Sequence, residues 1–191
     1  MKPLLITCIS LFALTPFAQS SANDFEAALS TETAQLTFYS DSSLIGWGGS
    51  DLALGVFYND DSSLVAQGSL MQMRQASEDA PLTFGVGVKA YAGSVDDYDE
   101  TVVAFAIGGE LRYTIPGTMP MAVYGRGFYA PKITSFADAE EVTDLSVGFQ
   151  IEAMPQTIAF IGIRHLEFGI DDKSDYKADD NNIHVGVRLT F

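Results

Sequence analysis

The stretch NNIHVGVRLTF (residues 181–191) alternates between apolar and other side chains. One face holds Ile183, Val185, Val187, Leu189 and Phe191, whereas His184, Gly186, Arg188 and Thr190 lie on the other. A period of two residues is typical of a β-strand with one apolar face. That face requires an apolar environment, which is either a protein core or the hydrocarbon of a membrane.

The same alternation recurs over residues 51–59, 82–91, 103–114 and 143–152. The second face of these strands is small and sparsely charged, because it consists mainly of Gly, Ala, Ser and Thr with few charged residues. A soluble β-sandwich would place many charges on that face. Small side chains with a few charges are instead typical of the interior of a narrow barrel whose apolar face contacts lipid.

The strand rhythm predicts an all-β fold, a transmembrane antiparallel β-barrel of about ten strands, with eight as the alternative. The strands are expected at 25–30, 34–40, 51–59, 64–73, 82–91, 102–114, 121–130, 143–152, 157–168 and in the final stretch that ends at 191. The facing of 64–73 and 157–168 stays open, because both alternate poorly. Pairing of the first strand with the last would close the barrel.

The connections also follow a membrane-barrel pattern. Residues 115–120 and 154–157 are short and uncharged, whereas 93–100, 130–141 and 169–182 are longer and acidic. Short periplasmic turns and longer outer loops are typical of outer-membrane barrels. We therefore expect the three acidic segments to be loops outside the cell. Trp47, in the segment 43–50, is expected in a periplasmic turn at the membrane interface.

Charge and composition exclude several classes of protein. The formal net charge is −15 and the pI is about 4.2, which argues against a nucleic-acid partner. Hydrophobic residues make up 47% of the chain, which is too much for a disordered acidic tail. No residue pattern points to a cofactor.

Residues 1–22 are predicted to be a signal peptide, and residues 23–191 the barrel domain. Lys2 precedes an apolar run over residues 4–14, and small residues follow up to Ala22. We expect cleavage after Ala22, with cleavage after Ser20 or a retained anchor as alternatives. The only cysteine, Cys8, lies in this segment, so the mature chain would have no disulfide. The expected location is the outer membrane of a Gram-negative cell.

The apolar face that ends in Phe191 is interpreted as an assembly signal. It comprises Ile183, Val185, Val187, Leu189 and Phe191. The expected partners are therefore outer-membrane lipid and the barrel-insertion machinery, and the expected state is a monomer.

Most basic residues of the mature chain fall on expected inward positions, together with several acids. The expected charge network comprises Lys89, Glu110, Arg112, Arg126, Asp144, Glu152, Arg164 and Arg188. Buried charges require partners, so we expect a salt-bridged plug that fills the barrel. This favours a structural or surface-interaction protein, with a narrow pore for small solutes or ions as the alternative.

Two further alternatives have weaker support. An outer-membrane enzyme with a rim active site could use His165 with Glu167 and a nearby serine such as Ser174, although no recognisable nucleophile motif is present. The acidic stretch near the last strand could bind a divalent cation, but it lacks EF-hand spacing. Its candidate ligands are Asp171, Asp172, Asp175, Asp179 and Asp180. His184 is expected in the lumen and His165 at the rim.

Three stretches resemble the YfaZ family of small outer-membrane proteins. They are VYGRGFYAPK (123–132), IGIRHLEF (161–168) and HVGVRLTF (184–191), and the strand rhythm of most of the mature chain agrees with them. The resemblance implies an integral outer-membrane barrel. It carries over no catalytic or binding residue.

Overall fold

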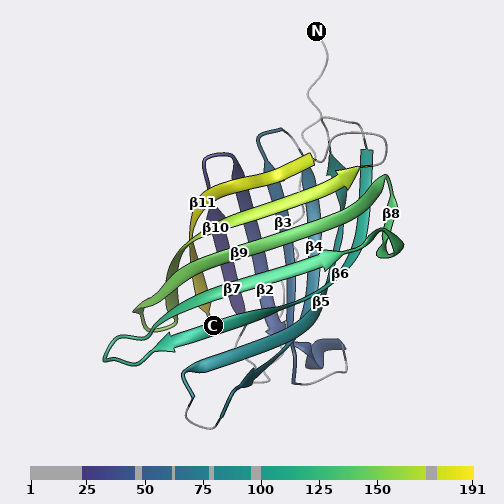
Figure 1. Ribbon diagram of the computed structural model, residues 1–191. Coiled ribbons are helices and arrows are strands. Elements are labelled where there is room, and N and C mark those ends of the chain that lie inside the picture. Colours follow the sequence, from purple (N-terminus) through teal and green to yellow (C-terminus); the bar gives the residue numbers. More distant parts are fainter. Residues whose placement is uncertain (1–22, 46–48, 62, 78–79, 96–99, 171–175) are drawn as a thin grey trace.

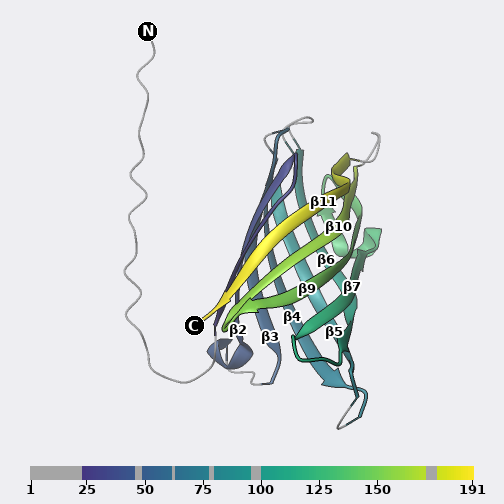
Figure 2. The same cartoon turned by 90° about the vertical axis from the view of Figure 1, so that its left-hand side faces the viewer.

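Ten long antiparallel strands close into a tilted barrel in the computed structural model (Figures 1 and 2). The structure describes residues 23–45, 49–61, 63–77, 80–95, 100–170 and 176–191. The signal peptide predicted at 1–22 and Trp47 lie outside these ranges. The barrel strands are β1 (Asp24–Leu29), β2 (Thr33–Asp41), β3 (Asp51–Asn59), β4 (Leu64–Gln75), β5 (Leu82–Val95), β6 (Glu100–Ile115), β7 (Met121–Ala130), β9 (Ala139–Met154), β10 (Thr157–Ile170) and β11 (Tyr176–Thr190).

The first and last strands close the barrel, as the sequence predicts. β1 pairs with β2 on one side and with β11 on the other, with Ala27 opposite Val187. The backbone N–H of Asn23 donates to the carbonyl of Phe191 at 3.1 Å, and the Phe191 N–H donates back at 2.9 Å. Closure removes the unpaired strand edges that an open sheet would expose. The count of ten is confirmed for the described residues, and the alternative of eight is excluded.

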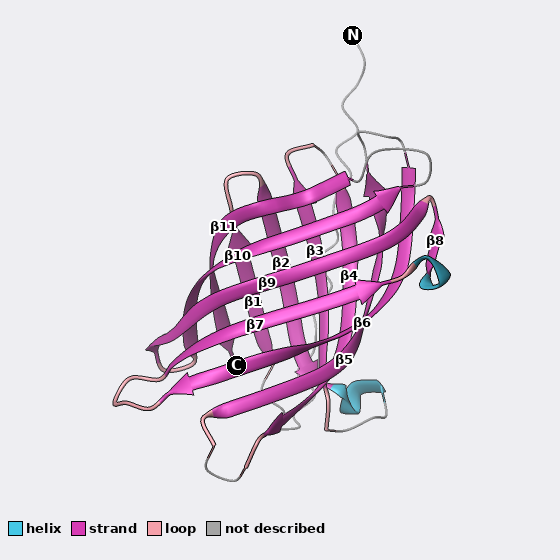
Figure 3. Cartoon of the chain, in the orientation of Figure 1, coloured by secondary structure: helices cyan, strands magenta, loops and turns pink. Residues whose placement is uncertain are grey.

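The two ends of the barrel differ. The end that holds Asn23, Phe191 and the 3-10 helix η1 (Ser42–Ile45) is called the terminal end, and the opposite one the far end. At the far end, β7 stops at Ala130 while β6 and β9 continue. The 3-10 helix η3 (Lys132–Thr134) and the short strand β8 (Ser135–Ala137) follow β7 there, and β8 pairs with the far part of β6 (Figure 3).

The predicted contrast between short and long connections holds only in the second half of the chain. β1 and β2 are joined at the far end by a short turn, as are β3 and β4, whereas the terminal-end connection from β2 to β3 is longer. The expectation of loops at 93–100, 130–141 and 169–182 is also partly wrong. Strands β5, β9 and β11 extend into these segments, because neighbouring strands continue to pair beyond the apolar belt.

The exterior of the barrel is apolar, as the alternation predicts. Val86 and Ile107 are among the most exposed large apolar side chains, at 64% and 69%. Similar side chains on neighbouring strands continue the belt, including Leu54, Leu111, Val147, Ile163, Val185 and Leu189. Such a surface is compatible with hydrocarbon rather than with water. No helix in the described ranges is long and apolar enough to cross a membrane.

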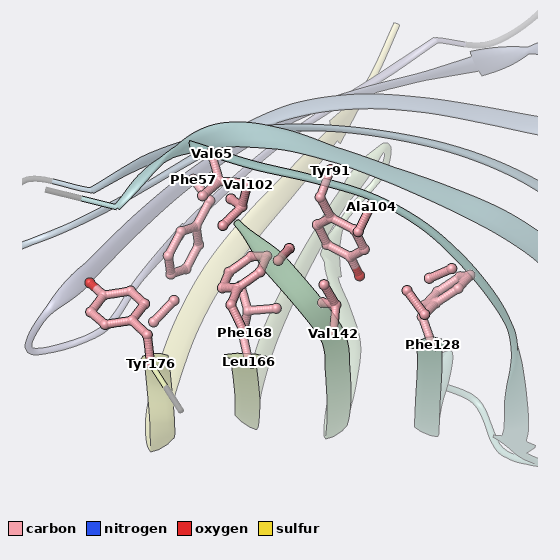
Figure 4. Packing of buried hydrophobic residues seen from close by; sticks show 14 of the residues in the cluster. Phe57, Val65, Tyr91, Val102, Ala104, Phe128, Val142, Leu166, Phe168 and Tyr176 are labelled. Atoms are coloured by element: carbon pink, nitrogen blue, oxygen red, sulfur yellow. The ribbon is translucent and has the colours of Figure 1, made fainter. Parts of the chain in front are cut away.

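The interior has two halves of different chemistry. Toward the far end, apolar and aromatic side chains from opposite walls meet, including Phe57, Tyr91, Leu166 and Phe168 (Figure 4). This cluster settles the facing of β4 and β10, because Val65, Met71, Leu166 and Phe168 lie inside. The expected salt-bridged plug therefore does not extend through the far half, where the packed side chains are mainly apolar. Charged side chains are concentrated nearer the terminal end.

Inward glycines make room for bulky neighbours on adjacent strands. A Cβ added at Gly162 would lie 2.9 Å from the His184 ring, and a Cβ at Gly186 would collide with the Phe160 ring. The Phe160 and His184 rings contact edge to face, with centroids 6.0 Å apart. The frequent glycines of the second face are thus a packing requirement of the narrow interior.

Candidate functional site

The first charge cluster lies at the seam between β1 and β11. Glu26 and Arg188 are directly opposite in register, and Arg188 donates from Nε and Nη2 to Glu26 Oε2 at 2.9 and 2.6 Å. Tyr39 on β2 donates its hydroxyl to Glu26 Oε1 at 3.3 Å, and the Arg188 guanidinium lies 4.4 Å from the centroid of the Tyr39 ring. The cluster therefore joins three neighbouring strands at the point of closure.

The second cluster lies on β6 and β7, where one carboxylate is shared by two guanidinium groups. Glu110 accepts from Arg112 Nη2 at 2.6 Å and from Arg126 Nε at 2.8 Å. Arg126 is its direct register partner, whereas Arg112 lies two residues further along β6 on the same face. Two positive charges thus share one negative charge, which leaves this cluster with an excess of one positive charge.

A third set of contacts crosses the barrel on the terminal side of the apolar cluster. Asp144 on β9 accepts from Lys89 Nζ and from the Tyr91 hydroxyl, both on β5 and both at 2.7 Å. Arg164 on β10 donates to the side-chain oxygen of Gln35 on β2. These bonds join strands that are not neighbours in the sheet, and they satisfy charges that have little access to water.

Seven of the eight charges predicted for the lumen lie in these three sets. Glu152 is the exception, because it is exposed close to the turn between β9 and β10. Sequence reasoning missed Glu26, Tyr39 and Gln35. The signal for Glu26 was present, since Phe25, Ala27 and Leu29 alternate with it in the first predicted strand and so place it inside.

A cavity of about 520 Å³ occupies the terminal half of the interior. It reaches the terminal end, because Asp24 and Asp51 begin their strands and Asp41 ends its strand there. Arg112, Arg126 and Arg188 also line it, and Met71 and Met73 contribute apolar side chains to the lining. The cavity is large enough for a small ligand, since ligand pockets in proteins typically measure 300–1,000 Å³.

His165 and Glu167 of the proposed enzyme site lie together, on the opposite side of the barrel wall from His184. His165 lies on the outer face of β10, where its Nε2 is 3.3 Å from Glu167 Oε2, whereas His184 is buried inside against Phe160. Ser174 lies outside the described residues. The two histidines therefore cannot act in one site.

The predicted metal ligands are only partly described. Asp171, Asp172 and Asp175 lie outside the described residues, and only the backbone of Asp180 is placed. Asp179 is buried and accepts from Thr33 Oγ1 at 3.5 Å. In the part of the chain that the structure describes, no three His, Cys, Asp or Glu side chains form a group that could hold a metal ion.

The proposed assembly signal lies on the exterior of β11. Ile183, Val185, Val187 and Leu189 are exposed along the strand, and Phe191 follows at the terminal end. They adjoin Phe25 and Leu29 of β1, whose register partners are Leu189 and Val185. The strand that carries the signal is therefore also the strand that closes the barrel.

A closed antiparallel barrel with an apolar belt, an even number of strands and both described ends on one side defines an integral outer-membrane β-barrel protein. The chain belongs to the YfaZ precursor family, whose model matches residues 1–191. "Precursor" suits a protein made with an export signal; cleavage after Ala22 stays a prediction. No curated protein matches the sequence.

Several solved structures are similar to the chain at a low level. A bacterial polysaccharide outer membrane secretin has a TM-score of 0.47 and 14% identity, covering 83% of this chain and 55% of that one. The KdgM porin has a TM-score of 0.47 and 9% identity, and the match covers 89% of this chain and 99% of the porin. The outer membrane channel DcaP of Acinetobacter baumannii has a TM-score of 0.41 and 13% identity, and the match covers 87% of this chain and 54% of DcaP. The chain thus spans about half the length of the secretin and of DcaP.

Proposed function

We propose that the protein is a closed outer-membrane barrel that acts through its ends and its lipid-facing surface rather than by conducting solutes. The observation that carries this proposal is the apolar packing of the far half of the interior. Phe57, Tyr91 and Phe168 project into it from different strands, and the exposed fraction of each side chain is below 2%. We expect the functional partners to be lipid and molecules outside the barrel.

An apolar layer of this kind is a barrier to ions. A hydrated ion that crossed it would lose water without gaining polar ligands, which is unfavourable in an apolar environment. A hydrogen bond also fixes the position of Tyr91 in this layer, because its hydroxyl donates to Asp144 at 2.7 Å. The edge-to-face contact of the Tyr91 and Phe168 rings, with centroids 6.0 Å apart, ties β5 to β10 across the barrel. The layer is therefore fixed by both packing and hydrogen bonds.

The alternative is a narrow pore, and it is favoured by the charges of the terminal half. Arg112, Arg126 and Arg188 line the cavity of about 520 Å³ and would attract anions into it. Such a pore would require the aromatic layer to move aside. The oligomeric state proposed for the closed barrel is a monomer, because its closure involves no second chain.

Planar-bilayer recordings of the refolded protein test the proposal. We expect no discrete conductance from the wild type, and we expect conductance from the double variant Phe57→Ala/Phe168→Ala, which removes two rings from the layer. Phe105→Ala removes a ring from the lipid-facing side and is the matched control, which should stay closed. Regular conductance steps from the wild type would overturn the closed barrel and establish the pore.

A further inference from the structure

The cavity at the terminal end has the chemistry of a binding site, whether or not the far half conducts. Its opening carries three carboxylates, those of Asp24, Asp41 and Asp51. Asp41 lies directly opposite Asp51 in the β2–β3 register, so these like charges face each other. A cationic group placed between them would relieve their repulsion.

The basic side chains that line the cavity favour anions instead. Arg112 and Arg126 share the single carboxylate of Glu110, as described above, which leaves an excess positive charge. The Nε of Arg112 is buried and has no hydrogen-bond partner among the described residues. A guanidinium has five N–H donors, so Arg112 can still bind an anionic group. A carboxylate is the simplest anion that fits this position.

A buried hydroxyl supplies a separate indication that the cavity receives a ligand. Ser40 lines the cavity, is only 5% exposed, and its Oγ has no partner within the described part of the chain. A buried polar group without a partner is unfavourable and needs an explanation. Because Ser40 and Asp41 both line the cavity, the Ser40 oxygen can accept a hydrogen bond from a cation that the carboxylates attract.

Apolar side chains complete the lining of the cavity. Ala53, Met71 and Met73 contribute them beside the carboxylates and the arginines. Gly85 leaves space for the two methionines, since a Cβ at that position would collide with both sulfur atoms. Methionine side chains adapt readily to an irregular apolar ligand.

We propose that the cavity binds a small zwitterion, with an ammonium group at Asp24, Asp41, Asp51 and Ser40, a carboxylate at Arg112, and an apolar body against Met71 and Met73. Both charges are required by this assignment. A simple anion would meet the three carboxylates of the opening, and a simple cation would leave the excess positive charge of Arg112 and Arg126 uncompensated.

Isothermal titration calorimetry on the refolded barrel in detergent micelles tests the site. The probes are 4-aminobutyrate, 6-aminohexanoate and 8-aminooctanoate, which vary the spacing between the charges, with hexylamine and hexanoate as single-charge analogues. At least one zwitterion should saturate the protein and bind about tenfold or more tightly than either analogue, since each lost charged hydrogen bond costs about that much. Equal affinity for an analogue, or no zwitterion binding at millimolar concentrations, would overturn the proposal.

Matched variants assign the two ends of the site. Asp51→Asn and Arg112→Gln should each weaken zwitterion binding by about tenfold or more, without affecting the single-charge analogue that lacks the corresponding group. Glu152→Gln and Arg74→Gln alter exposed charges outside the cavity and should leave the affinity unchanged. Asp51 is itself exposed at the opening, so Asp51→Asn tests the site without disturbing the folded interior. Unchanged affinity in Asp51→Asn would refute the assignment of the ammonium end.

Discussion

The ion pair of Glu26 and Arg188 should be the most sensitive point of barrel closure. The two side chains are 9% and 13% exposed, and they bridge β1 and β11 through two short hydrogen bonds. Glu26→Gln leaves the Arg188 guanidinium without its counter-charge in the interior. Arg188→Met leaves the Glu26 carboxylate with only the weaker bond from Tyr39 at 3.3 Å. Each single substitution therefore leaves a buried charge without compensation.

Removal of one partner of a buried pair costs about 3–5 kcal/mol, whereas replacement of both by neutral groups is often close to neutral. The lower value applies here, because the cavity beside Arg188 admits some water. We expect each single variant to lose about 3 kcal/mol of unfolding free energy. The double variant Glu26→Gln/Arg188→Met should recover most of this loss and lie within about 1 kcal/mol of the wild type.

Urea unfolding in lipid vesicles, followed by tryptophan fluorescence, measures these four stabilities. Glu141→Gln is the control, because it neutralises an exposed carboxylate that accepts from Tyr129 on the exterior, and it should cost about 1 kcal/mol or less. Two results would show that the pair does not stabilise the β1–β11 pairing. One is single variants as stable as the control, and the other is a double variant whose loss of unfolding free energy equals the sum of the two single losses.

Three further changes test other parts of the structure. Ile107→Arg places a charge in the lipid-facing belt and should cost about 2–4 kcal/mol in the same urea assay, and a tolerated arginine would contradict the facing of β6. Phe168→Ala leaves a cavity in the packed far half and should lower the unfolding free energy by about 3–5 kcal/mol, whereas Phe105→Ala on the outer face should lower it much less. Phe191→Ala should lower the amount of heat-modifiable protein in the outer-membrane fraction, whereas Thr190→Ala should not, and equal amounts would refute the assembly signal.

The facing of most strands could be predicted because lipid and lumen impose different side chains on alternate positions. Val86, Ile107 and Val147 are exposed on the belt, while Lys89, Glu110 and Asp144 lie inside. The apolar far half was harder to recognise, since both faces of β4 and β10 carry apolar residues there. Val65 and Leu166 are buried against other interior residues, whereas Leu64 and Ile163 are exposed on the belt. The poor alternation of these strands was itself the sign of an apolar interior.

Contacts across the barrel could not be predicted from the pairing of neighbouring strands. Lys89 and Asp144 belong to β5 and β9, which are not adjacent, and their ion pair depends on barrel diameter and tilt. The register of β10 against β11 also shifts twice near Arg164–His165 and Leu166–Glu167, and Asn181 adopts a φ of 60°. Such bulges change which residues face inward, so the burial of Asp179 did not follow from simple alternation.

Single-cysteine labelling tests most directly that the lumen opens only at the terminal end. We expect this end to face the periplasm, because the acidic segments expected outside the cell lie at the far end. Cys8 is the only cysteine and precedes the predicted cleavage site, so an introduced cysteine can be labelled alone. Ala53→Cys lies in the cavity, Ala104→Cys in the apolar far half, and Asp60→Cys at the exposed far end. With a membrane-impermeant maleimide, Asp60→Cys should react in intact cells, Ala53→Cys only when the reagent is admitted to the periplasm, and Ala104→Cys in neither case. Labelling of Ala53→Cys or Ala104→Cys in intact cells would contradict the closed barrel.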